Sequence, residues 1–323
     1  MRVSRRSDPA PGLTRSFHER IAAAYWQHKP RAQRSYLRCD TGDRYHDHCG
    51  LGEFNHSLLQ STEPNHQALL LAEMHQMEAA QSERLLSYVP AIDPTQHILD
   101  AGAGRGGTSI AAAQRFGCRI SGVDLASHQV ELANQLARER GCADRVQFHH
   151  RNLVDTGFAA ELFDVVIANE VTMYVDVDDA LAELARVLKP RGRLVLFTWC
   201  RSDSVEPTCL QARVIDASHV CRTHRRTEYA QALQRCDLAL LREVDLTAEV
   251  ASYFDLRRHI HGFGSEDSAD EAFRSGFQSG GLQYLAVVAE RIPSGFQKES
   301  HVISDRDDPR SGGRAALSPA AQR

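Results

Sequence analysis

A glycine-rich segment followed by an acidic residue is the part of this chain best suited to binding a small ligand. Residues 98–109 read Ile-Leu-Asp-Ala-Gly-Ala-Gly-Arg-Gly-Gly-Thr-Ser, and Gly-Val-Asp-Leu follows at 122–125. Glycines let the backbone approach a ligand closely, and Asp100 suits a cation better than a phosphate. Taken alone, the glycine loop is as consistent with an ordinary tight strand-to-helix turn as with a ligand-binding loop. Asp124 favours a nucleoside cofactor, because a carboxylate after the next strand can accept both ribose hydroxyls.

The glycine loop resembles motif I of the class I S-adenosylmethionine (SAM) methyltransferases, which predicts SAM as the cofactor. Asn152 follows a third predicted strand and offers the donor and the acceptor that an adenine edge requires. An isolated asparagine is also a common loop residue, but its register with the two acids favours the cofactor. The candidate cofactor-binding residues are Asp100, Gly102, Gly104, Asp124, Leu125, Asn152, Leu153 and Asn169.

Glu170 follows the fourth predicted strand, where a parallel sheet presents side chains to a bound ligand. A carboxylate there can act as a general base or stabilise a cation. The alternative is an acid that begins the next helix, a role for which Asp176 and Asp178 lie closer. Tyr174 can turn the negative face of its ring toward a cation, or be an ordinary core residue. Glu170 and Tyr174 are therefore the candidate catalytic residues.

Longer motifs resemble the geranyl diphosphate 2-C-methyltransferase family, bacterial enzymes that methylate prenyl diphosphates. The resemblance spans about residues 25–291. Its specific parts are Asn-Glu-x-Thr-Met-Tyr-Val-Asp at 169–176, Tyr-His-x-His-x-Gly-x-Gly at 45–52, His-Arg-Arg-x-Glu-Tyr at 224–229 and Gly-Leu-Gln-Tyr at 281–284.

The resemblance implies a C-methylation in terpenoid biosynthesis. An alkene carbon of the prenyl diphosphate takes the methyl group, a carbocation forms, and Glu170 removes a proton from the methylated carbon. Water must be excluded so that it does not trap the cation. The resemblance also implies Mg²⁺ bound largely by the diphosphate, although it assigns no protein ligands to the metal.

A diphosphate requires cationic partners, and basic residues gather in the two segments expected to cover the site. Any one of them is as readily a solvated surface charge. The histidines at 46 and 48 also have a spacing open to zinc, but no matching Cys or His set accompanies them. The candidate substrate-binding residues are Arg34, Arg38, Tyr45, His46, His48, Arg225 and Tyr229.

Departures from the family leave the acceptor open. Residues 200–222 contain no Phe, Tyr or Trp, which predicts a wider pocket and gives a farnesyl chain the same weight as a geranyl chain. Cys49 stands where the family has a tyrosine, and Asp124 where it has a hydroxyl residue. The alternatives are C-methylation of another lipid-like alkene (a sterol, a tocopherol precursor or an acyl chain) and a non-catalytic SAM-binding protein.

The elements that must position these residues alternate from residue 97 onward. Alternation predicts an α/β, class I methyltransferase (Rossmann-like) fold with a seven-stranded, mostly parallel sheet whose last two strands form an antiparallel edge. The expected strands are 97–100, 119–124, 146–150, 164–168, 193–199, 240–246 and 283–291. The expected helices are 18–26, 66–89, 108–116, 127–140, 178–187, 228–236 and 250–261.

The domain plan has a helical cap and an inserted lid. We expect a disordered tail at 1–17, the cap at 18–96, a methyltransferase domain at 97–292 with a lid insertion at 200–226, and a second disordered tail at 293–323. A net charge of −4, eight cysteines without a Cys-x-x-Cys pair, and no signal-like or membrane-length apolar run predict a cytoplasmic protein. We expect neither nucleic-acid nor membrane binding, and homo-oligomerisation stays open.

Overall fold

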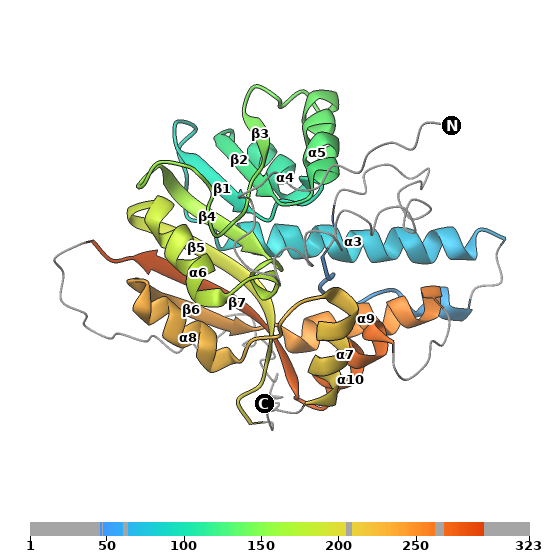
Figure 1. The fold of residues 1–323 in the computed structure, drawn as a ribbon. Coiled ribbons are helices and arrows are strands. Elements are labelled where there is room, and N and C mark those ends of the chain that lie inside the picture. The colour runs from blue at the N-terminus through green and yellow to red at the C-terminus, as the bar shows by residue number, and fades with distance from the viewer. Residues whose placement is uncertain (1–45, 47, 61–63, 205–208, 262–267, 294–323) are drawn as a thin grey trace, which may run out of the picture.

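Seven strands form one sheet in the order β3-β2-β1-β4-β5-β7-β6, with helices on both faces (Figure 1). This computed structural model describes residues 46, 48–60, 64–204, 209–261 and 268–293. The α/β class with a seven-stranded, mostly parallel sheet is therefore confirmed. The strands are β1 (His97–Ala101), β2 (Arg119–Asp124), β3 (Val146–His150), β4 (Phe163–Asn169), β5 (Leu188–Arg201), β6 (Leu238–Asp245) and β7 (Leu282–Arg291).

Strand direction brings the predicted ligand loops to one edge of the sheet. Strands β1 to β5 are parallel to one another, and Ala101 is in register with Val123 of β2 and Ala168 of β4. The carboxyl ends of these strands consequently lie side by side. The expected antiparallel edge is confirmed, because the last two strands, β6 and β7, lie at one edge of the sheet and pair antiparallel. Only β7 runs antiparallel, since it lies between β5 and β6 and pairs antiparallel with both.

Eight α-helices are described, and most lie where the sequence predicts them. Buried side chains of α3, α4, α5 and α9 pack on one face of the sheet, and those of α6 and α8 pack on the other. Two helices, α7 and α10, are additional to the predicted set. The helices are α3 (His66–Ser87), α4 (Gly107–Phe116), α5 (Ser127–Glu139), α6 (Val177–Val187), α7 (Leu210–His219), α8 (Arg226–Arg235), α9 (Thr247–His261) and α10 (Ala269–Gln278).

Helix α10 supplies aromatic rings that the predicted lid lacks. Phe273 stacks on Phe254 of α9 with ring centroids 4.8 Å apart and meets Trp199 of β5 edge-on at 5.0 Å. Phe277 continues this cluster to Tyr284 of β7, 6.5 Å away. These rings pack against one another in the core on one face of the sheet, so the width of the pocket stays a prediction.

Several predicted segments fall partly or wholly outside the described residues. These are the two tails, the helix at 18–26 and part of the cap. Within the described part of the cap, a short 3-10 turn (His56–Gln60) precedes α3, which packs against α4 and α9. The lid role of 200–226 stays a prediction. None of the described helices is long and apolar enough to cross a bilayer.

Candidate active site

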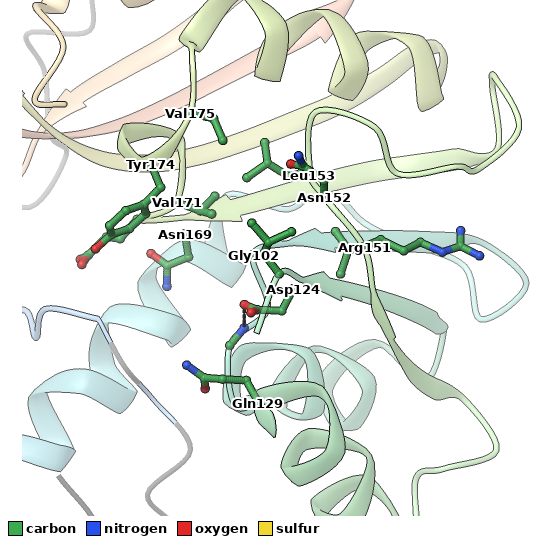
Figure 2. A pocket seen from close by; sticks show the side chains of 14 residues that line it. Gly102, Asp124, Gln129, Arg151, Asn152, Leu153, Asn169, Val171, Tyr174 and Val175 are labelled. Atoms are coloured by element: carbon green, nitrogen blue, oxygen red, sulfur yellow. Dashed lines mark hydrogen bonds between the residues drawn. The ribbon is translucent and has the colours of Figure 1, made fainter. Parts of the chain in front are cut away.

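A cavity with an open volume of about 730 Å³, its solvent-facing part included, lies at the carboxyl ends of β1 to β4 (Figure 2). Figure 2 shows that side chains from separate strand ends surround it, among them Asp124, Asn152 and Asn169. Nine of the residues predicted for catalysis or cofactor binding line this cavity. They are Gly102, Gly104, Asp124, Leu125, Asn152, Leu153, Asn169, Glu170 and Tyr174.

The glycine loop is held by Asp124 and by the end of β2. The carboxylate of Asp124 accepts the Gly104 N–H at 2.9 Å with one oxygen and the Ala126 N–H at 2.8 Å with the other. Gly102 has a φ of +77°, and a Cβ at that position would lie 2.3 Å from Cγ2 of Val171. Only glycine fits there, so the turn keeps the loop close to the cavity.

Asn152 lines the cavity and also takes the loop role that the sequence leaves open. Its side chain is buried in the cavity wall, and its oxygen accepts the Val154 N–H at 3.1 Å, as in an Asx turn. Leu153 lines the same wall. The loop role of Asn152 is therefore real, and it orients the side chain at the cavity.

Asp100 lies in a second, adjoining cavity of about 340 Å³. Gly102, Gly104 and Asn169 line both cavities, so the two lie next to each other. Burial raises the pKa of Asp100 to about 7, with a smaller contribution from Asp124, against the lowering effect of the 2.6 Å hydrogen bond from Ser109. Burial thus favours the protonated form of Asp100 far more than is usual for an aspartate.

Glu170 is held in an unusual backbone conformation at the first cavity. Its φ is +50°, in the left-handed region that non-glycine residues rarely adopt. Its own N–H donates to the Phe197 carbonyl at 2.9 Å, and its buried carboxylate accepts the Cys49 N–H at 3.0 and 3.1 Å. The Tyr284 hydroxyl donates to the same carboxylate at 2.5 Å. Tyr174, at the end of a 3-10 turn (Thr172–Tyr174), lines the cavity beside it.

His46 and His48 line the second cavity and share a hydroxyl cluster. His48 Nε2 lies 3.0 Å from Ser82 Oγ and 3.1 Å from His46 Nδ1, and Thr108 Oγ1 lies 2.9 Å from Ser82 Oγ. Burial, followed by the effect of His48, lowers the pKa of His46 to about 3. His46 is therefore neutral at neutral pH and acts through hydrogen bonds, not as a standing cation. In the described part of the chain, no cluster of three or more His, Cys, Asp or Glu side chains could hold a metal.

Comparison with known proteins shows what this chain is similar to. A family model described as "Methyltransferase domain" matches residues 99–196. The chain is 36% identical over 290 residues to the geranyl diphosphate 2-C-methyltransferase of Saccharopolyspora erythraea, covering 87% of this chain and 100% of that relative. It is 34% identical over 285 residues to the geranyl diphosphate 2-C-methyltransferase of Streptomyces lasalocidi, covering 88% and 93%.

A solved relative has the same fold. The geranyl diphosphate C-methyltransferase from Streptomyces coelicolor A3(2), in complex with Mg²⁺, geranyl diphosphate and S-adenosyl-L-homocysteine, matches with a TM-score of 0.78 at 31% identity. That match covers 86% of this chain and 100% of the relative. The chain belongs to the geranyl diphosphate 2-C-methyltransferase family. It is a SAM-dependent methyltransferase with the class I fold.

Two residues predicted to bind substrate in this methyltransferase lie elsewhere. Tyr229 is buried on the α6/α8 face of the sheet, where its hydroxyl lies 2.8 Å from those of Thr172 and Thr198. The prediction that Tyr229 binds substrate is wrong, because the side chain is a core residue whose hydroxyl already has hydrogen-bond partners. Arg225 is the N-cap residue of α8 and lines neither of the two cavities. Arg34, Arg38 and Tyr45 lie outside the described residues.

Three residues near the methyltransferase site have no role in the sequence prediction. Gln81 of α3 and Tyr284 of β7 are fully buried and belong to the hydrogen-bond network of Glu170. Gln129 lines the first cavity from α5, and its buried Oε1 has no hydrogen-bond partner within the described residues. The sequence carries a signal for each glutamine. Gln81 is a polar residue among the apolar residues of the helix expected at 66–89, and Gln129 lies in the first turn of the helix after Asp124.

Proposed function

We propose that this methyltransferase transfers a methyl group from SAM to an alkene carbon of a prenyl diphosphate and that Glu170 is the base. The observation that carries the proposal is the placement of Glu170. A buried carboxylate, fixed by the Cys49 N–H and the Tyr284 hydroxyl, lines the cavity that Asp124 and the glycine loop form. A capping acid would not need that position.

The residues of the cavity fit SAM. Asp124 presents a carboxylate suited to ribose hydroxyls, and Asn152 and Leu153 offer a polar edge and an apolar wall suited to adenine. Asp100 in the second cavity and Glu170 in the first add negative charge, which suits a cationic cofactor. When bound, SAM supplies an electrophilic methyl group.

Glu170 and its surroundings can complete the reaction on the substrate. The alkene electron pair forms the new carbon–carbon bond to the methyl group as the carbon–sulfur bond breaks, and the neighbouring carbon becomes cationic. The ring face of Tyr174 and the Glu170 carboxylate stabilise that charge. Glu170 then accepts the proton of the methylated carbon, and the electron pair of that C–H bond restores the double bond.

The acceptor is a geranyl or a farnesyl diphosphate in this proposal. Two relatives and the solved structure are geranyl diphosphate methyltransferases, which supports the geranyl chain. On the family resemblance, Arg34, Arg38, Tyr45, His46 and His48 are proposed to contact the diphosphate, with Mg²⁺ bound mainly by its phosphates.

One assay tests the substrate class. The protein is incubated with SAM, Mg²⁺ and isopentenyl, geranyl, farnesyl or geranylgeranyl diphosphate, and products are separated by liquid chromatography and mass spectrometry. We expect one added methylene mass on the geranyl or farnesyl diphosphate. Methylation of a neutral sterol or acyl lipid, with none of the diphosphates modified, would contradict the proposal.

A variant tests the base. Glu170→Gln keeps the size of the side chain but cannot accept the proton. We expect turnover to fall at least roughly 100-fold, within the usual range for a general base. Calorimetry should show an unchanged affinity for S-adenosylhomocysteine. Turnover near that of the wild type would exclude Glu170 as the base.

A further inference from the structure

Four side chains from three elements form a directed chain of hydrogen bonds that ends at Glu170. Gln81 Nε2 donates to Asn169 Oδ1 at 2.6 Å and to the Tyr284 hydroxyl at 2.7 Å. Asn169 Nδ2 donates back to Gln81 Oε1 at 3.0 Å. Tyr284 donates to Glu170 Oε1 at 2.5 Å. The network joins α3 and β7 to the end of β4, where Asn169 lines both cavities.

The direction of the Tyr284 proton follows from the donor chemistry. An amide N–H can only donate, so the Tyr284 oxygen accepts from Gln81 and its own proton points to Glu170. Burial, together with the charge of Glu170, raises the pKa of Tyr284 well above its usual value, which keeps the hydroxyl protonated. The two carboxylate oxygens are consequently held differently, because Tyr284 bonds to Oε1.

We propose that Tyr284 and Gln81 are positioning residues for the reaction: Tyr284 holds Glu170 in its ionised form with one oxygen fixed, and Gln81 orients Tyr284 and ties it to Asn169 at the cofactor cavity. The inference rests on the proposed role of Glu170 as base. A hydrogen bond donated to a carboxylate stabilises its charged form. The network therefore keeps the base ready before a substrate arrives.

A substitution at Tyr284 leaves the other titratable groups near Glu170 unchanged. Cys49, in the segment before α3, contacts the carboxylate, and Glu170 contributes to raising the pKa of this buried thiol, which stays neutral. Beyond Cys49, the charges of Arg257 on α9 and Asp270 on α10 oppose each other in their effect on that thiol. A change at Tyr284 alone leaves all three in place.

The experiment titrates Glu170 directly by difference infrared spectroscopy of its carboxyl stretch, assigned by the loss of the band in Glu170→Gln. Tyr284→Phe removes one charge-assisted hydrogen bond to the Glu170 carboxylate. We expect this change to raise the midpoint of the Glu170 titration by roughly one pH unit or more. Gln81→Met, which keeps the length of the side chain, should shift the midpoint in the same direction by less. Tyr229→Phe is the matched control, since it removes a buried tyrosine hydroxyl on the other face of the sheet.

Kinetics provide the second measurement. In Tyr284→Phe the acid limb of the pH profile of kcat should shift to higher pH, by the same amount as the midpoint of the Glu170 titration. The KM for SAM should stay unchanged. Unshifted midpoints in both Tyr284→Phe and Gln81→Met would overturn the inference, as would an equal shift in Tyr229→Phe. The infrared titration needs no acceptor, so a shifted midpoint without methylation of any diphosphate would contradict the proposed function alone.

Discussion

Asp124 both faces the cofactor cavity and organises the glycine loop, because each of its oxygens accepts a backbone N–H. Asp124→Asn keeps one acceptor oxygen and loses the charge and one of these bonds. Hydrogen bonds to charged groups contribute about 1.5–3 kcal/mol, so we expect the affinity for S-adenosylhomocysteine to fall roughly 10- to 100-fold. Isothermal calorimetry measures the change.

Asp93→Asn is the control for that variant. Asp93 accepts the N–H of the residue two positions on, Thr95, at 2.8 Å, as Asp124 accepts that of Ala126, but it lies on the surface away from both cavities. The affinity of Asp93→Asn for S-adenosylhomocysteine should match that of the wild type. Equal affinities for all three proteins would remove Asp124 from the cofactor site.

We predict that Asp100 makes the binding of SAM depend on pH. Its pKa of about 7 lies above the ordinary 3.8, and a bound cation favours the ionised form. Affinity for SAM should therefore fall as the pH drops below about 7, by at most roughly tenfold per unit, and level off above it. Asp100→Asn should flatten this profile. Asp164→Asn, at the opposite end of the sheet, should keep it, and a profile unchanged in Asp100→Asn would contradict the assignment.

The same carboxyl affects stability without cofactor. Because its folded-state pKa is raised, the contribution of Asp100 to the free energy of unfolding is complete below pH 3.8 and is lost as the pH rises to about 7. Bound SAM should offset that loss.

Local patterns identified the residues whose role depends on adjacent sequence. The glycine loop, Asp124 and Asn152 each follow a strand end, and parallel pairing brings strand ends together without further information. Tyr284 and the Cys49 N–H reach Glu170 across 114 and 121 residues of chain. No periodicity encodes such contacts, so the position of Glu170 at the cavity was predictable and its hydrogen-bond partners were not.

At the scale of elements, α10 escaped prediction although it carries a start signal. Ser268 accepts the Glu271 N–H at 3.2 Å, and Ser-x-x-Glu is the sequence of a capping box. The helix is only ten residues long and contains Gly276, which weakens its apolar pattern. Tertiary packing compensates, since Leu282 lies where a Cβ on Gly276 would be.

That packing predicts the effect of a core substitution in α10. Phe273 is buried between Trp199 and Phe254. Phe273→Ala should lower the free energy of unfolding by about 3–5 kcal/mol, measured by urea denaturation. Leu210→Ala on α7 removes a side chain that is 65% exposed and should change stability by less than about 0.5 kcal/mol. Similar losses in both variants would contradict the aromatic cluster as the support of α10.

At the scale of the whole molecule, alternation predicted the sheet and its antiparallel edge but not the order of the strands. Strand periodicity located all seven strands within a few residues, yet it carries no information on which neighbour a strand joins. The position of β7 between β5 and β6 matters for the site. It places Tyr284 beside Phe197 and within hydrogen-bond distance of Glu170.

The described residues, together with a solved relative, predict that magnesium binds with the diphosphate. The described residues hold no group of three metal-ligating side chains, and His46 is neutral with its ring committed to hydrogen bonds. The solved Streptomyces coelicolor relative contains Mg²⁺ together with geranyl diphosphate. We expect Mg²⁺ alone to give no binding heat with the S-adenosylhomocysteine complex, and to bind once a prenyl diphosphate is present. Chelation should then stop methylation without changing the affinity for S-adenosylhomocysteine, and micromolar binding of Mg²⁺ to the protein without diphosphate would contradict this order.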